Sequence, residues 1–146
     1  MEDLRKLFTD EALIRTAIDC CFKVYRKLGR YVLEHAYQIA LAHELQKEGL
    51  EVEVEKNMDL TYDDMVIENA YRADLIVNSR LIIELKAAKK MLPEFHSQIA
   101  TYMVLSNIPN GLLVNFHAEL LRNEIYRKSL HGILEYKSNF NNRQPK

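Results

Sequence analysis

The chain has 146 residues, of which 48% are hydrophobic and 28% charged, and its formal net charge is −1. This length suits one domain with a substantial buried core, and the composition is ordinary for a soluble globular protein. No apolar run approaches the roughly 20 residues that span a bilayer, and the N-terminus lacks a signal-peptide core. The adjacent cysteines Cys20 and Cys21 are poorly placed for a mutual disulfide. We therefore expect a reduced, cytoplasmic protein that does not enter a membrane.

The charges are distributed unevenly along the chain. Residues 1–70 contain 15 acidic and 9 basic side chains, whereas residues 71–146 contain 6 acidic and 11 basic ones. The near-zero total argues against strong nonspecific binding to nucleic acid. The basic second half is compatible with a phosphate-containing partner, and chance segregation explains it equally well.

Two amphipathic helices are predicted in the first third of the chain. The first follows an N-cap signal at Thr9, has apolar positions spaced by three and four, and ends at Gly29. The second is predicted over about residues 32–48, before a glycine. Glu34 lies at the margin of its apolar stripe, where it is either an exposed helix charge or part of a site.

Strands are predicted in the middle of the chain. Residues 51–55 alternate Glu and Val, which is typical of a half-exposed strand. Residues 59–67 predict a strand pair with its turn at Tyr62–Met65. Two runs of branched aliphatic residues in the stretch 71–88 flank Asn78-Ser79-Arg80, and this arrangement predicts a β-hairpin.

Three charges interrupt this hairpin: Asp74 in its first strand, and Glu84 and Lys86 in its second. Residues two apart in a strand share a face, so Glu84 and Lys86 point the same way. Asp74 lies on the same face as these two residues only if the loop has an odd number of residues or the hairpin contains a bulge. We therefore predict a three-residue turn at residues 78–80, or an equivalent bulge. Charges in so apolar a segment are costly unless they are paired or bind a metal. A structural ion pair at a sheet edge is the ordinary alternative.

Further elements are predicted after the hairpin. Pro93 fits the first turn of a helix that runs to about Ser106 and carries Gln98. Residues 112–116 predict a buried strand, and residues 119–126 predict a last strand or a short helix.

No internal repeat or linker divides the chain. We expect a single domain over residues 1–137, followed by a polar tail at residues 138–146. The tail is expected to be frayed because its side chains are mostly polar and it lies at a terminus.

The order of Asp74, a hairpin and then Glu84-x-Lys86 resembles the active-site motif of the PD-(D/E)xK nuclease superfamily. The resemblance covers roughly residues 14–127. It implies an α/β domain of restriction-endonuclease-like fold, in which a central mixed sheet carries the site at one edge. The first two helices and the Pro93 helix would flank that sheet.

The resemblance is closest to the small bacterial proteins named for their GxxExxY motif. Glu34 and Tyr37 match the Glu and Tyr of this motif, and Tyr31 stands at the position of its glycine. Gln98 matches the glutamine of a later helix. The resemblance implies that the Glu34 carboxylate faces the metal site.

A Mg²⁺ or Mn²⁺ site is implied by the same resemblance, because such ions favour oxygen ligands. Lys86 would orient or deprotonate the attacking water and stabilise charge on the phosphate. Gln98 would position Lys86, the water or a phosphate oxygen, and Lys89 and Lys90 offer further phosphate contacts. The implied metal ligands are Asp74, Glu84, the Leu85 carbonyl and Glu34, with Glu34 either a direct ligand or a group just outside the coordination shell.

The function implied is metal-dependent hydrolysis of phosphodiester bonds in DNA or RNA, with nucleic acid as the partner. The alternative is a noncatalytic nucleic-acid-binding or protein-interaction domain that retains a nuclease fold. The net charge of −1 and the presence of Tyr31 favour the alternative, whereas the complete set of Asp74, Glu84 and Lys86 favours the enzyme. A homo-oligomer is compatible with either function.

Overall fold

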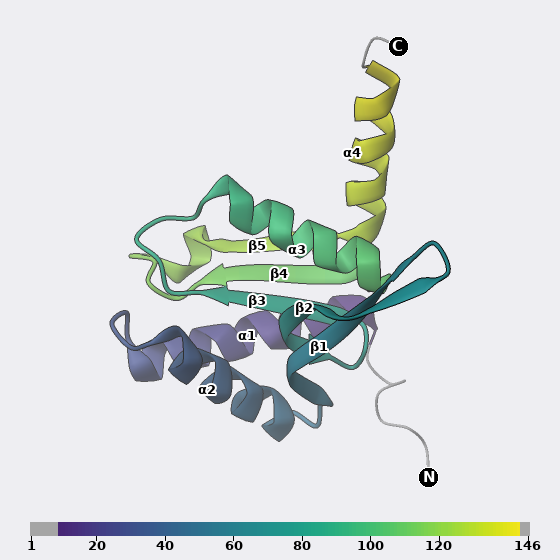
Figure 1. The fold of residues 1–146 in the computed structure, drawn as a ribbon. Helices are drawn as coiled ribbons and strands as arrows, with labels where there is room; N and C mark the ends of the chain where they lie inside the picture. Colours follow the sequence, from purple (N-terminus) through teal and green to yellow (C-terminus); the bar gives the residue numbers. More distant parts are fainter. Residues whose placement is uncertain (1–8, 144–146) are drawn as a thin grey trace.

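The computed structural model describes residues 9–143, which form a five-stranded mixed sheet with helices on both faces (Figure 1). The strand order is β1-β2-β3-β4-β5; β3 and β4 run parallel, and the other neighbours pair antiparallel. This arrangement confirms the predicted α/β class with a central mixed sheet. The elements are α1 (Asp10–Leu28), α2 (Glu34–Lys47), β1 (Val52–Tyr62), β2 (Met65–Val77), β3 (Leu81–Lys86), α3 (Pro93–Ser106), β4 (Asn110–Asn115), the 3₁₀ helix η2 (Leu121–Asn123), β5 (Ile125–Ser129) and α4 (Leu130–Arg143).

The helices begin and end where local chemistry predicts. Thr9 caps α1, because its Oγ1 accepts a hydrogen bond of 3.1 Å from the Ala12 N–H. Gly29 ends the helix with a φ of 73°, a conformation that glycine adopts without steric cost. The second helix starts at Glu34, two residues later than predicted, and Pro93 opens α3 as predicted.

Two apolar clusters hold the layers together. One packs α1 and α2 against one face of the sheet, and the other packs α3 against the opposite face. The second contact is close, because a Cβ atom at Gly111 of β4 would lie 2.5 Å from the Met103 Sδ of α3. Cys20 and Cys21 are both buried and unpaired on α1.

The turn between β2 and β3 contains three residues, as predicted. Val77 pairs with Leu81, and the intervening Asn78 and Ser79 have φ values of 51° and 55°. The Asn78 side chain fixes the turn, since its Oδ1 accepts a hydrogen bond of 2.9 Å from the Glu51 N–H. The odd loop places the predicted charged positions of both strands on one face.

The first two strands are longer than predicted. We expected one strand at residues 51–55 and a separate strand pair at residues 59–67. Instead, β1 is one continuous strand over Val52–Tyr62, and β2 continues from Met65 to Val77. Positive φ values at Glu55 and Asn69 and a register shift near Met58 interrupt the alternation without ending the pairing. A bulge of this kind absorbs an extra residue while the ladder continues.

The C-terminal segment also differs from the prediction. Residues 119–126 form η2 followed by the start of β5, so both the short helix and the strand are present. The frayed tail predicted from Ser138 is wrong up to Arg143, because α4 runs through these residues and projects away from the sheet (Figure 1). A polar sequence without glycine or proline at these positions is compatible with a helix surrounded by solvent. No helix in the described range is long and apolar enough to cross a membrane.

Candidate active site

The candidate site begins where β2 and β3 separate. Their ladder ends at the pair Leu75 and Ile83. Beyond that pair, the Asp74 N–H donates to Glu84 Oε1 at 3.0 Å, and the Leu85 N–H donates to Asp74 Oδ2 at 3.0 Å. Each carboxylate therefore takes the place of a backbone partner on the opposing strand. This exchange holds the two acids side by side on one face of the sheet.

Glu84 is the most enclosed of the predicted acids, with only 3% of its surface exposed. Burial raises the pKa of its carboxyl group, and the neighbouring Asp74 charge raises it further. A hydrogen bond from the Asp74 backbone and the positive charge of Lys86 oppose this rise. The pair is thus a crowded site of negative charge, where a bound cation would stabilise the ionised form.

Lys86 lies two residues beyond Glu84 on the same strand face, and α3 holds its side chain. Its Nζ donates to Gln98 Oε1 at 3.1 Å and lies 4.5 Å from the centre of the Phe95 ring. Gln98 in turn donates from Nε2 to the Tyr102 hydroxyl at 3.0 Å. The ammonium group therefore has a defined position beside the acids.

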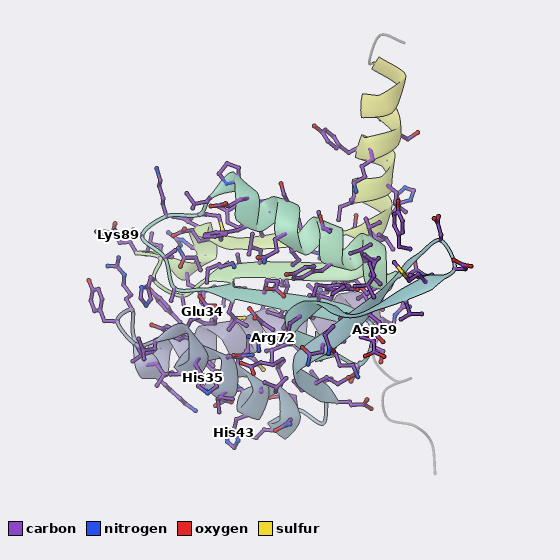
Figure 2. The ribbon with its side chains drawn as sticks, in the orientation of Figure 1. Glu34, His35, His43, Asp59, Arg72 and Lys89 are labelled. Carbon is purple, nitrogen blue, oxygen red and sulfur yellow. The ribbon has the colours of Figure 1, made fainter. Side chains whose placement is uncertain are left out.

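Glu34 is the first residue of α2 and lies at the margin of this group. Its side chain is largely exposed, yet partial burial and the Asp74 charge raise the pKa of its carboxyl group. Lys86 and a hydrogen bond from the Ala87 backbone act in the opposite direction. Figure 2 shows Glu34 at the start of α2, at the same end of the sheet as Lys89 on the loop after β3.

Tyr37 fixes the chain that leads to Glu34. Its hydroxyl donates to the Gly29 carbonyl at 2.6 Å and accepts from the Val32 N–H at 3.4 Å. Its ring stacks on Phe116 with 4.7 Å between centroids. Tyr31 is 85% exposed and does not have a positive φ, so the backbone at this position does not require glycine.

Two buried amides that support the site were missed in the sequence. Gln38 donates from Nε2 to the Asp74 carbonyl at 3.1 Å, and Asn115 brackets Ala88 by accepting from its N–H at 3.1 Å and donating to its carbonyl at 2.9 Å. Gln38 lies one helical turn after Glu34, and Asn115 is a polar residue in an apolar strand. The positions of these two amides in the sequence could have indicated a supporting role, since buried amides normally have hydrogen-bond partners.

The acids at this site would supply only part of the coordination shell of a Mg²⁺ or Mn²⁺ ion. Within residues 9–143, no three His, Cys, Asp or Glu side chains are grouped closely enough to hold a metal. Asp74 and Glu84 supply two adjacent carboxylates, and Mg²⁺ commonly binds one or two carboxylates and keeps several waters. The Leu85 carbonyl points to the same side of its strand as its N–H, toward Asp74. The donor set is therefore suitable in chemistry and small in number.

The mixed sheet, the paired acids and the adjacent lysine together define a nuclease-like α/β domain. Residues 11–128 match the sequence profile of the PD-(D/E)XK nuclease superfamily. The chain belongs to this superfamily.

Other comparisons give less detail. The chain is similar to a solved structure described as "Crystal structure of SSO0001", with 20% sequence identity and a TM-score of 0.45. The similarity covers 92% of this chain and 71% of that one. No curated protein shows a significant match to the chain.

Proposed function

We propose that this protein is a metal-dependent nuclease that hydrolyses phosphodiester bonds in DNA or RNA. One observation carries the proposal: the Asp74 N–H donates to the Glu84 carboxylate and the Leu85 N–H donates to the Asp74 carboxylate, which puts both acids on the strand face that also carries Lys86. This arrangement of two acids and a lysine supports metal-assisted hydrolysis of a phosphodiester.

Each residue has a role that its position supports. Asp74, Glu84 and the Leu85 carbonyl would hold a Mg²⁺ or Mn²⁺ ion, and Glu34 would contribute a further oxygen directly or through water. The bound ion would polarise the scissile phosphate and lower the pKa of a bound water. Occupancy by a cation favours the ionised form of Glu84, whose pKa is otherwise raised.

Lys86 acts on the water and the phosphate. Its ammonium group orients the attacking water and stabilises negative charge that develops on the phosphate. Gln98 holds the lysine through its side-chain oxygen and is itself held by Tyr102, so this group is positioned before substrate binds. Positioning of this kind avoids a reorganisation cost during the reaction.

Within the superfamily, we place the chain with the GxxExxY proteins. The support is the pair of Glu34 and Tyr37, in which the tyrosine orders the segment before α2 and so sets where the glutamate projects. The unpaired, buried cysteines are compatible with the cytoplasmic location that we assign.

A noncatalytic nucleic-acid-binding or protein-interaction domain that retains a nuclease fold is the second candidate function. The net charge of −1 favours its protein-interaction form, because a domain that binds a polyanion usually has a more basic surface. The two functions make different predictions for the same substrates.

The deciding experiment combines cleavage and metal binding. Purified protein is incubated with Mn²⁺ and single- or double-stranded DNA or RNA, and Mn²⁺ binding is measured by calorimetry. The nuclease proposal predicts cleavage and metal binding that are both lost in Glu84→Gln. Metal binding without cleavage of any substrate would favour the noncatalytic domain, and absence of metal binding would contradict the proposed site.

A further inference from the structure

A hollow lies outside the candidate active site, between α3, β5 and α4. Its volume is about 490 Å³. His96, Ser97 and Thr101 of α3 line one side of it, and Lys128 of β5 and Lys137 of α4 line the others. The proposed reaction uses none of these side chains.

The hollow is basic and holds no described carboxylate in its wall. Arg127, which also lines it, is engaged by a two-point ion pair with Glu11. Lys128 has no carboxylate partner in the described part of the chain: its Nζ donates to His96 Nδ1 at 2.7 Å, and the imidazole accepts as a neutral group. The Lys128 ammonium group thus presents a positive charge without a carboxylate partner at the wall of the hollow, and an anion bound beside it would be stabilised.

The titration behaviour of this pair agrees with its geometry. Burial lowers the pKa of Lys128, and burial together with the Lys128 charge lowers the pKa of His96. Neither shift has an acidic neighbour among its causes. The lowered pKa of His96 favours the neutral imidazole that accepts from Lys128, so the lysine carries the positive charge of the pair.

The hollow and the active site are neighbours through the first turns of α3. Phe95, whose ring lies against the Lys86 ammonium group, directly precedes His96 in the chain. Gln98 contacts Lys86, whereas Ser97 and Thr101 face the hollow. A nucleic-acid strand that crosses the start of α3 would therefore contact both places.

We propose that this hollow binds a backbone phosphate of the nucleic-acid strand whose scissile phosphate lies at Asp74 and Glu84. Lys128 and His96 make the principal contact, and Lys137 contributes charge from the exposed rim. The inference rests on the proposed function, since it extends the same substrate beyond the point of cleavage. The hollow thus fixes the path of the strand, and the acids and Lys86 perform the chemistry.

The test compares single-charge variants with a matched control. Lys128→Gln removes the inner charge, and Lys137→Gln removes one from an exposed position where the fold is not at risk. Lys23→Gln serves as the control, because Lys23 lies on α1, across the sheet from α3, and pairs with Glu48. Binding of fluorescein-labelled DNA and RNA oligonucleotides is measured by anisotropy at several salt concentrations, without divalent metal.

Lys128→Gln and Lys137→Gln are each expected to weaken oligonucleotide binding by about 3–10-fold. Each should also reduce the slope of log affinity against log salt concentration by about one. The Lys23→Gln control should match the wild-type protein. Cleavage of bis(p-nitrophenyl) phosphate with Mn²⁺ should be unchanged in all three variants, because this small diester does not extend to the hollow.

The outcomes separate this inference from the proposed function. If Lys128→Gln and Lys137→Gln both bind oligonucleotides with wild-type affinity and wild-type salt dependence, the inference is overturned. The nuclease proposal then stays intact, provided that the small diester is cleaved. Failure of the wild-type protein to bind any oligonucleotide would overturn the proposed phosphate site in the hollow as well as the proposed nucleic-acid substrate. An equal loss of affinity in the Lys23→Gln control would also overturn the inference, because the effect would then reflect total charge.

Discussion

The two halves of the β2–β3 hairpin are built differently. In the half next to the turn, Leu75–Val77 and Leu81–Ile83 pair through backbone hydrogen bonds, and their side chains are almost entirely buried. In the other half, the backbone groups of Asp74 and Leu85 bond to side chains instead. We refer to these as the closed half and the open half.

The difference shows how one short hairpin serves both stability and chemistry. The closed half contributes apolar burial on both faces of the sheet. The open half places two carboxylates together, and burial with the neighbouring Asp74 charge raises the pKa of the Glu84 carboxyl group. A site with this cost is tolerable because the adjacent ladder and the packed helices over-determine the backbone. Substitutions in the two halves should therefore affect different properties.

The largest effect on stability is expected for Ile83→Ala in the closed half. Ile83 is fully buried and faces the α1 and α2 cluster, away from the Glu84 carboxylate. The substitution should reduce the free energy of unfolding by about 2–5 kcal/mol, the usual cost of such a truncation. Urea denaturation measures this, with the exposed Val66→Ala as the control. A loss no larger than that of the control would contradict the assignment of the closed half as the stabilising part.

Lys86→Ala in the open half should affect catalysis and spare stability. On the proposed mechanism, cleavage falls by about two or more orders of magnitude, the scale for a positioned charge-stabilising or proton-transfer group. Mn²⁺ binding should be kept or strengthened, because a competing positive charge is removed. Gel-based cleavage and calorimetry measure the two properties. Lys23→Ala, at an ion-paired position on α1, is the matched control and should change the rate only slightly.

A Lys86→Ala protein that cuts at the wild-type rate would remove Lys86 from the mechanism. Loss of Mn²⁺ binding in the same variant would instead show that the lysine organises the acids. Either result would weaken the division of the hairpin into a stabilising half and a chemical half.

Gln38→Met tests the support that α2 gives to the open half. The change conserves the approximate size of a buried side chain but leaves the Asp74 carbonyl without its amide donor. The expected loss is about 1–3 kcal/mol of unfolding free energy, the cost of an unsatisfied buried acceptor. The exposed Gln46→Met on the same helix is the control in urea denaturation. If both variants are equally stable, the Asp74 carbonyl does not depend on Gln38.

The closed half and the acids of the open half could be predicted from the sequence because they depend on local rules. Strand alternation placed Glu84 and Lys86 on one face, and the parity of the turn added Asp74. The three-residue turn confirmed this inference. Pairing within a hairpin is set by neighbours in the chain, so a single sequence contains enough information.

The supporting contacts could not be predicted in the same way. Gln38 and Asn115 contact residues 36 and 27 positions away, and periodicity carries no information about which distant backbone groups they meet. The length of α4 was missed because polarity alone does not separate a solvent-exposed helix from a frayed tail. Both errors concern the tertiary environment of a residue and not its local propensity.

The smallest change in stability is expected for Asp74→Asn. The asparagine Oδ1 can still accept from the Leu85 N–H, and the backbone N–H of residue 74 still donates to Glu84, so both hydrogen bonds are retained. Removal of the Asp74 charge also takes away one cause of the raised Glu84 pKa. Stability without metal should therefore be unchanged or slightly higher, while stabilisation by added Mn²⁺ is lost because a ligand is missing.

The pH dependence sharpens this prediction. In the wild-type protein the folded Glu84 holds its proton above the ordinary pKa of 4.5, so its contribution to stability is complete below that pH and is lost as pH rises through the raised value. In Asp74→Asn the carboxyl group is still buried, but the repulsion is gone, so the decline should be shallower. Urea denaturation between about pH 5 and 8, with and without Mn²⁺, measures both effects. Strong destabilisation with an intact response to Mn²⁺ would instead identify Asp74 as a structural ion-pair residue, and the open half would then serve stability like the closed one.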